Sequence, residues 1–389
     1  MWNALHPIIL PTILLNFVPG DKKNTTLGLL TFAGLVIAMV IQPVSGAVSD
    51  GWVSKFGRRR PLMVIGTLFD FVFLSILAWG GGFTWLLLGY IGLQISSNTA
   101  QGSFQGLLPD RVSENQLGKA ASLKTFMDTF GLILAALLAG RMMDPQTHNP
   151  TAITLVVIGL LAISASITIF FTSEEPVRDH ARLDWASISA YFKIDFRKNK
   201  AYWWLTAERA SFLLGIYGLQ AFGQYYLQDV LRVPDPPKQM GNLLASITFG
   251  VLLLVLIGGW LSDRFGAKKV LYGASFLAAA GMILMLLTRN ALGLTLFGSV
   301  VGAGIGLFLT SNWALANRLA PAEEAGKFLG LTNLATAGSG ALARLEGPAI
   351  DTLNTMWPQA WVGYKGLFVF GAACMLISIL FLSKIQTRE

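Results

Sequence analysis

The stretch that decides the fold, residues 42–62, reads QPVSGAVSDGWVSKFGRRRPL. An apolar segment ends near a glycine, one aspartate follows at Asp50, and three arginines (Arg58–Arg60) precede Pro61. The 389-residue chain around it is 53% hydrophobic and only 13% charged, whereas soluble globular chains carry about 25% charged residues. We therefore predict an all-α membrane protein whose charge gathers in its loops.

About twelve apolar runs of roughly 20 residues, the length that crosses a bilayer core, recur along the chain. They lie near 2–18, 27–49, 62–80, 83–108, 118–143, 151–172, 201–230, 240–261, 269–288, 291–319, 327–350 and 362–384. The first run has no basic leader and no small-residue cleavage site, so we expect an anchor rather than a signal peptide.

The loops between these runs alternate in charge. One set holds the segment 178–200 and the residues Lys55, Arg58–Arg60, Arg111, Arg264, Lys268, Lys269, Arg318 and Lys327, while the other set carries few charges. Because basic loops stay on the cytoplasmic side, we expect a multi-pass protein of the plasma (inner) membrane with both termini in the cytoplasm. The net charge of +8 then reflects orientation in the lipid bilayer and not nucleic-acid binding.

The two halves of the chain resemble each other. GGWLSDRFGAKK (258–269) repeats SGAVSDGWVSKFGRRR (45–60), and residues 97–110 align without gaps on residues 309–322. We predict a six-helix bundle over 1–172, a cytoplasmic linker over 173–200 and a second six-helix bundle over 201–389. Parallel repeated halves around a central site are typical of transporters that work by rocking.

Two copies of one loop pattern carry a resemblance to a known family. Gly-x-x-x-Asp followed by a glycine and basic residues occurs at 46–59 and again at 259–269. On these motifs the chain resembles the major facilitator superfamily. The first copy, together with NTAQGSFQGLLPD (98–110), resembles more narrowly the sucrose–proton symporters and the glycoside–pentoside–hexuronide:cation symporters. The resemblance implies the major facilitator fold, about 12 transmembrane helices in two six-helix pseudo-repeats, with the first, fourth, seventh and tenth lining a cavity.

The repeated loops are predicted to form a latch that holds one side shut in one conformational state. Asp50 is placed to accept N–H groups from a neighbouring helix start, which the resemblance implies is the eleventh span. Arg58 and Arg59 are predicted to pair with Asp110, or with Glu174 and Glu175. The gating residues are Gly46, Asp50, Arg58, Arg59, Asp110, Glu174, Asp263 and Arg264. The alternative is that the arginines only fix topology.

Polar residues recur at helical spacing on the fourth, seventh and tenth spans. We expect these amides and aromatic rings to bind a hydroxyl-rich solute, although they would serve equally as hydrogen bonds between helices. The candidate solute-binding residues are Asn98, Gln101, Gln105, Tyr217, Gln220, Gln224, Thr310, Trp313 and Asn317. Gln94 and Gln105 stand where the sucrose symporters have an aspartate and an arginine, which weakens the expectation of sucrose itself.

Energy coupling requires a titratable or ion-binding group inside the membrane. Our first candidate is Asp128, with Lys124 one turn before it as its counter-charge. Asp70 and Glu208 are further candidates. A permanent structural ion pair between Lys124 and Asp128 is the alternative.

The sequence as a whole predicts a secondary active transporter, a proton- or sodium-coupled symporter of a sugar or glycoside-like solute, acting as a monomer. The alternatives are a transporter of amphipathic, drug-like compounds and a non-transporting membrane assembly factor on the same scaffold. An enzyme is not expected, because the three histidines lack metal-ligand spacing. No phosphate-binding Gly-Lys-Ser/Thr motif occurs, so we do not expect ATP to drive transport directly. No cofactor is expected beyond the coupling H⁺ or Na⁺.

Overall fold

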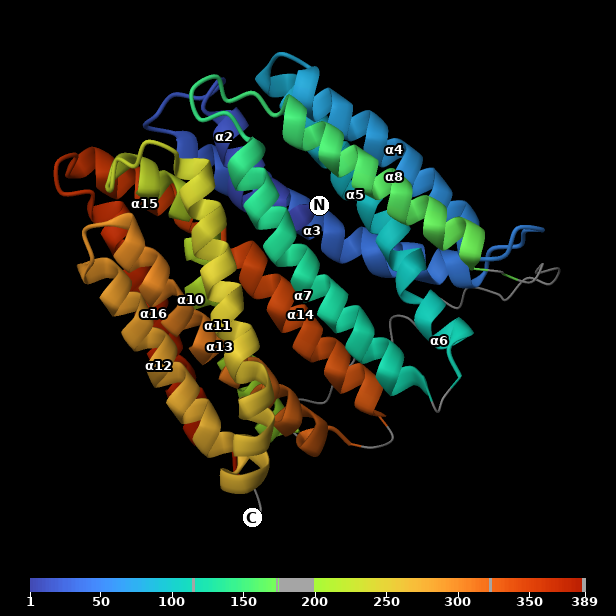
Figure 1. The fold of residues 1–389 in the computed structure, drawn as a ribbon. Coiled ribbons are helices and arrows are strands. Elements are labelled where there is room, and N and C mark those ends of the chain that lie inside the picture. The colour runs from blue at the N-terminus through green and yellow to red at the C-terminus, as the bar shows by residue number, and fades with distance from the viewer. Residues whose placement is uncertain (114–115, 173, 175–198, 322–323, 387–389) are drawn as a thin grey trace. The chain divides into compact units, whose positions relative to one another are not determined.

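The computed structural model describes residues 1–113, 116–172, 174, 199–321 and 324–386 (Figure 1). Within these ranges the regular elements are helices, which confirms the predicted all-α fold class. Of the predicted linker 173–200, only Glu174, Asn199 and Lys200 are described, so Glu175 and most of the linker lie outside the described residues.

The described helices account for the twelve predicted spans. The first span is divided into α1 (Trp2–Ala4), the π-helical turn η1 (Leu5–Ile9) and α2 (Leu10–Leu14), and the eleventh into α14 (Ala325–Ala343) and α15 (Glu346–Met356). The other spans are α3 (Lys23–Asp50), α4 (Arg60–Trp79), α5 (Phe83–Gln105), α7 (Leu117–Met142), α8 (Thr151–Phe171), α10 (Lys200–Asp229), α11 (Pro236–Phe265), α12 (Ala267–Leu287), α13 (Ala291–Leu319) and α16 (Val362–Ser383), with the short α6 (Leu107–Arg111) after α5.

Helix starts follow from local chemistry. Asp235 caps α11, because its carboxylate accepts the N–H of Lys238 at 3.0 Å, and Asn290 caps α13 by accepting the N–H of Gly293 at 2.7 Å. Such side chains satisfy backbone donors that have no partner within the helix. Pro61 lies in the first turn of α4, where the missing N–H is tolerated.

Eight of the described helices are long and apolar enough to cross a membrane. They are α3, α4, α8, α11, α12, α13, α16 and the segment Leu123–Met142 of α7. The first span, α5, α10 and the divided pair α14–α15 do not meet that standard, because they are interrupted or carry more polar residues. Polar or broken segments within a membrane domain are tolerated where they face protein or a water-filled cavity.

Contacts between helices divide the chain into two compact units. The first unit comprises Met1, Ala33–Gly131 and Met142–Ile188, and the second comprises Trp2–Phe32, Leu132–Arg141 and Ser189–Glu389. These units differ from the sequence halves 1–172 and 201–389, because residues 2–32 and 132–141 pack on later helices. Gly28, for example, lies against the Arg344 carbonyl. The sequence halves describe a repeat rather than a contact group, and as domains they stay a prediction.

In the first unit, α4 packs on α5 and on α8 (Figure 1). A Cβ added at Gly66 of α4 would lie 2.7 Å from the Ser96 carbonyl of α5, so this glycine allows the two backbones to approach. Gly102 of α5 lies in the same way against the Gln42 carbonyl of α3. Gly46, one of the predicted gating residues, is less crowded: its Cβ would lie 3.6 Å from the Gly102 carbonyl.

In the second unit, α13 packs between α11 and α12, and α10 contacts α14 and α16. Gly302 of α13 lies directly on the Ile247 carbonyl of α11, with no room for a side chain. Phe212 of α10 and Phe308 of α13 are fully buried and stack with their ring centroids 3.7 Å apart. Van der Waals packing of this kind holds helices together where lipid removes the hydrophobic driving force.

Candidate functional site

A cluster of charged residues in the first unit is built around Arg59. Its guanidinium contacts Asp50 at 2.5 Å and Asp110 at 3.0 Å and donates to the Ser49 hydroxyl at 2.6 Å. Arg59 is 6% exposed, and a Cβ at Gly106 would collide with its guanidinium. An arginine is stable in such a site because each acceptor engages a different nitrogen of its planar fork.

Arg58 and Glu174 complete this Arg59 cluster. Arg58 donates to Asp110 at 2.6 Å, which raises the pKa of Arg58. Partial burial acts to raise the pKa of Asp110, but the hydrogen bonds from Arg58 and Arg59 outweigh it and hold that pKa below its usual value. Glu174 accepts the backbone N–H groups of Arg59 and Arg60 at 3.0 and 3.2 Å. A carboxylate there is favoured by the positive N-terminal end of α4.

The structure therefore brings Asp50, Arg58, Arg59, Asp110 and Glu174 into one cluster. Asp110 is one of the carboxylates named above as partners of Arg58 and Arg59, whereas the contact between Arg59 and Asp50 is not among the predicted ones. Glu174 differs in detail, since it accepts from backbone N–H groups rather than from the arginine side chains. The predicted contact of Asp50 with the eleventh span stays a prediction.

The second copy of the motif is more open. Asp263 lies 3.7 Å from Arg318, and the two side chains are 81% and 58% exposed. Arg264 lies over the rings of Trp260 and Phe265, 5.2 and 5.4 Å from their centroids. The two copies of one sequence pattern therefore have different surroundings.

The candidate solute-binding residues of α5 fall into two groups. Asn98 is buried and donates to the Gln94 carbonyl at 2.7 Å and to its side-chain oxygen at 3.1 Å. Gln94 in turn donates to the Tyr90 hydroxyl at 2.7 Å. Gln101 and Gln105 are exposed. Of the three candidate amides on α5, these two are therefore accessible to a solute in this conformation.

The candidate solute-binding residues of α10 and α13 likewise divide into residues that bond to other helices and residues that are more exposed. Gln224 is buried and donates to the Thr12 hydroxyl at 2.7 Å, and Thr310 donates to the Val255 carbonyl of α11 at 3.0 Å. Both act between helices in this conformation. Tyr217 and Gln220 are half-buried, whereas Trp313 and Asn317 are exposed.

The four candidate coupling residues have contrasting surroundings. Lys124 and Asp128 form an ion pair at 2.6 Å with 42% and 64% of their side chains exposed. Asp70 is 3% exposed and accepts the Ser96 hydroxyl at 2.5 Å. Glu208 is fully buried. Neither buried carboxylate forms an ion pair among the described residues.

Glu208 belongs to a network that the sequence reasoning missed. Asn312 of α13 donates to Glu208 Oε2 at 2.7 Å and accepts from Arg209 at 2.6 Å. Arg209 also donates to the Thr336 hydroxyl of α14 at 2.8 Å. The second oxygen of Glu208 is buried without a hydrogen-bond partner. Asn312 is not among the candidates because it lies next to Trp313 and off the helix face shared by Thr310, Trp313 and Asn317. The sequence feature that could have identified it is a polar amide within an apolar span.

Comparison with known proteins shows the family to which the chain belongs. The family model described as Major Facilitator Superfamily matches residues 6–343. The chain belongs to the Major Facilitator Superfamily. It is therefore an integral multi-pass membrane transporter and not an enzyme.

Individual relatives are distant. The sucrose transport protein SUC3 of Arabidopsis thaliana is 25% identical over 178 residues, 37% of this chain and 30% of that protein. The multi-drug resistance efflux pump PmrA of Streptococcus pneumoniae serotype 4 is 22% identical over 396 residues, 95% of this chain and 90% of that protein. The structure of a D-xylose–proton symporter has a TM-score of 0.72 at 14% identity, covering 99% of this chain and 94% of that one. This last match shows a shared fold.

Proposed function

We propose that the chain is a secondary active transporter that moves a sugar or glycoside-like solute together with a proton or sodium ion. The observation that carries the proposal is Glu208, a fully buried carboxylate in a membrane helix with one oxygen unpartnered. A buried charge is unfavourable unless it is paired, so such a group persists where binding and releasing a cation is its task.

Asn312 gives Glu208 a route to the rest of the unit. Cation binding at the free oxygen of Glu208 weakens the pull of its other oxygen on Asn312, which also holds Arg209. A change at one carboxylate thereby reaches α13 and α14. The Lys124–Asp128 pair remains the second candidate for coupling. Because both side chains are largely exposed, solvent screens their charges and weakens the effect of binding one cation.

The Arg59 cluster supports alternating access as the mechanism. Its bonds join the end of α3, the start of α4, the short α6 and the segment after α8 through Asp50, Asp110 and Glu174. We propose that it is formed in one conformational state and broken in the other, as a switch of a few kcal/mol requires. The basic loops favour cytoplasmic termini and the plasma (inner) membrane, and we expect a monomer in the lipid bilayer.

An amphipathic, drug-like solute is the second candidate. It is supported by the match to a multi-drug efflux pump along 95% of this chain, against 37% for the sucrose transporter. The exposed Trp313 suits a ring or an apolar group as well as a sugar face.

Reconstitution into proteoliposomes tests the proposal. We expect radiolabelled glycosides to accumulate when a proton or sodium gradient is imposed, and Glu208→Gln to abolish the accumulation while sparing solute exchange. Asp128→Asn is the matched control and should still accumulate solute. Accumulation that survives Glu208→Gln and fails in Asp128→Asn would transfer coupling to Asp128. Gradient-driven movement of hydrophobic cations but not of glycosides would establish the second candidate instead.

A further inference from the structure

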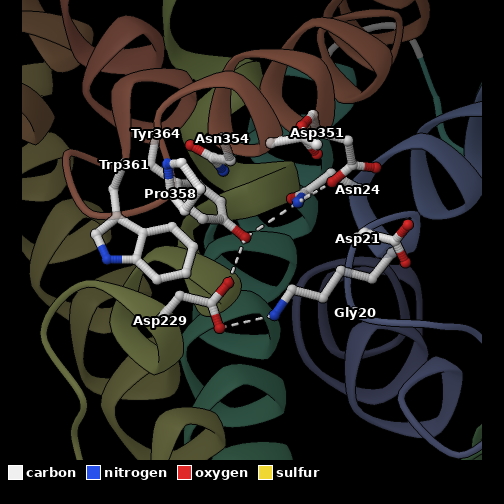
Figure 2. A pocket seen from close by; sticks show the side chains of 11 residues that line it. Gly20, Asp21, Asn24, Asp229, Asp351, Asn354, Pro358, Trp361 and Tyr364 are labelled. Atoms are coloured by element: carbon white, nitrogen blue, oxygen red, sulfur yellow. Dashed lines mark hydrogen bonds and ion pairs between the residues drawn. The ribbon is translucent and has the colours of Figure 1, made fainter.

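A cavity of about 390 Å³ lies in the second unit, at the N-terminal end of α3. Figure 2 shows the side chains that line it. It is formed where the starts of α3 and α16 meet the ends of α10 and α15. Its volume falls in the range of small-molecule sites, about 300–1,000 Å³. The lining residues used below are Asp21, Lys23, Asn24, Asp229, Asp351, Trp361 and Tyr364.

A chain of hydrogen bonds fixes the side chains around this cavity, as the dashed lines of Figure 2 show in part. Lys23 pairs with Asp229 at 2.7 Å, and the Tyr364 hydroxyl donates to the other oxygen of Asp229 at 2.8 Å. The Asn24 amide donates to the Tyr364 hydroxyl at 3.0 Å and to Asp351 at 2.8 Å. The ion pair with Asp229 thus neutralises the charge of Lys23.

The Asn24 side chain leaves one acceptor open. Asn24 is 1% exposed, and its Oδ1 is buried without a hydrogen-bond partner. The amide cannot correct this by turning over, because its oxygen would then face the Asp351 carboxylate. A buried acceptor without a donor is unfavourable, so an N–H group brought by a ligand would complete it.

Negative charge around the cavity is also incompletely balanced. Asp351 is 7% exposed and accepts the Thr25 N–H at 2.6 Å, but no ion pair to it occurs among the described residues. Asp21 is exposed and likewise forms no ion pair within the described ranges. Three carboxylates and one ammonium line the cavity, which favours a cationic ligand.

Two aromatic rings supply an apolar wall. The rings of Trp361 and Tyr364 lie 6.0 Å apart, tilted by 41°. Trp361 adopts φ 51°, the left-handed region, immediately before α16. An aromatic face attracts an ammonium group electrostatically and an alkyl chain by burial.

We propose that this cavity is a binding site for a small organic cation, a protonated primary amine. Its N–H groups bind Asn24 Oδ1 and the Asp351 carboxylate, and its alkyl part lies against Trp361. A divalent metal fits less well, because the described residues contain no group of three or more His, Cys, Asp or Glu placed to ligate one. A neutral sugar would satisfy Asn24 but would leave the charge of Asp351 unbalanced.

Calorimetric titration of the full chain in detergent tests this site directly. The probe is 3-methylbutylamine, which is protonated at neutral pH, and its neutral isostere 3-methyl-1-butanol is the control ligand. We expect the amine to bind and the alcohol to bind at least about tenfold more weakly. Asp351→Asn should weaken amine binding about tenfold, and Asp21→Asn, at an exposed position that the fold does not need, about threefold.

Matched variants distinguish amine binding in this cavity from amine binding elsewhere on the protein. Asp144→Asn, in the loop before α8, should leave amine binding unchanged, and so should Glu208→Gln, which alters coupling in the proposed transport function. Equal binding of amine and alcohol, no binding of the amine, or displacement of the amine by a neutral glycoside would overturn the inference. Loss of amine binding in Glu208→Gln alone would place the amine at that residue, and would equally overturn it.

Discussion

Arg59→Lys is expected to loosen the Arg59 cluster without unfolding the first unit. Lysine keeps the charge but has one nitrogen in place of a fork, so it retains one of the contacts to Asp50, Asp110 and Ser49. The bond to Ser49 is buried and is worth about 1.5 kcal/mol as a charged hydrogen bond. The bond to Asp50, whose side chain is 56% exposed, contributes about 0.5 kcal/mol after solvent screening.

The loss of about 2 kcal/mol corresponds to about a thirtyfold shift in a local opening equilibrium. Hydrogen–deuterium exchange of the peptide that covers residues 52–63 measures it, because the N–H groups of Arg59 and Arg60 are held by Glu174. We expect these amides to exchange about thirtyfold faster in Arg59→Lys if opening of the cluster limits their exchange.

Two further variants make the Arg59 result decisive. Gly106→Ala should reproduce it, since a Cβ at this position would displace the Arg59 guanidinium. Arg318→Lys, in the open second copy where the arginine is 58% exposed, should change exchange around Asp263 very little. Exchange in Arg59→Lys that matches the wild type, or an equal effect from Arg318→Lys, would refute the account of a buried, multiply bonded arginine.

Other predictions concern pH and packing. The pKa of Asp110 is lower in the folded protein than in the unfolded chain. The ionised Asp110 carboxylate therefore adds to the free energy of unfolding above its unfolded pKa of about 4, and this addition is lost as the pH falls through the lower folded pKa. Thermal unfolding followed against pH should therefore show an acid loss below about pH 4 that is smaller in Asp110→Asn. Gly302→Ala should destabilise the second unit by about 1–3 kcal/mol, since its Cβ would meet the Ile247 carbonyl. Gly273→Ala, with open space around it, should not lower the unfolding temperature, and a loss equal to that of Gly302→Ala would contradict the packing argument.

The spans are predictable because lipid leaves the backbone few alternatives to helix. The apolar run 291–319, for example, has the same limits as α13. The break after Ala343 is not predictable in this way, because its causes are distant in sequence. Arg344 donates to the Tyr217 carbonyl of α10 at 2.8 Å, and its own carbonyl lies against Gly28 of α3. No local pattern around 327–350 contains either partner.

The pairing of the loop arginines with Asp110 is predictable because few partners are possible, whereas the buried network around Glu208 is not predictable from the sequence. Arg58 and Arg59 have only a few carboxylates at neighbouring span ends to meet, and Asp110 is among them. Asn312, by contrast, connects Glu208 and Arg209 from a helix about one hundred residues away. Its role depends on which face of α13 meets α10, and the apolar composition of α13 carries little signal about that face.

The unequal surroundings of the two motif copies follow from what an arginine needs in order to be buried. Five N–H donors require several acceptors, and the first copy supplies them through Asp50, Asp110 and Ser49. The repeat alignment places Ala322 opposite Asp110, and Lys268 and Lys269 stand in the second copy where the first has arginines. Ser262, which corresponds to Ser49, shares a hydrogen bond with the Ser311 hydroxyl at 2.7 Å instead. A repeated sequence thus specifies the turn in both copies, where Gly57 has φ 92° and Gly266 has φ 89°. The anchored arginine, and with it the proposed latch, belongs to the first copy, in which arginines and not lysines follow the turn glycine.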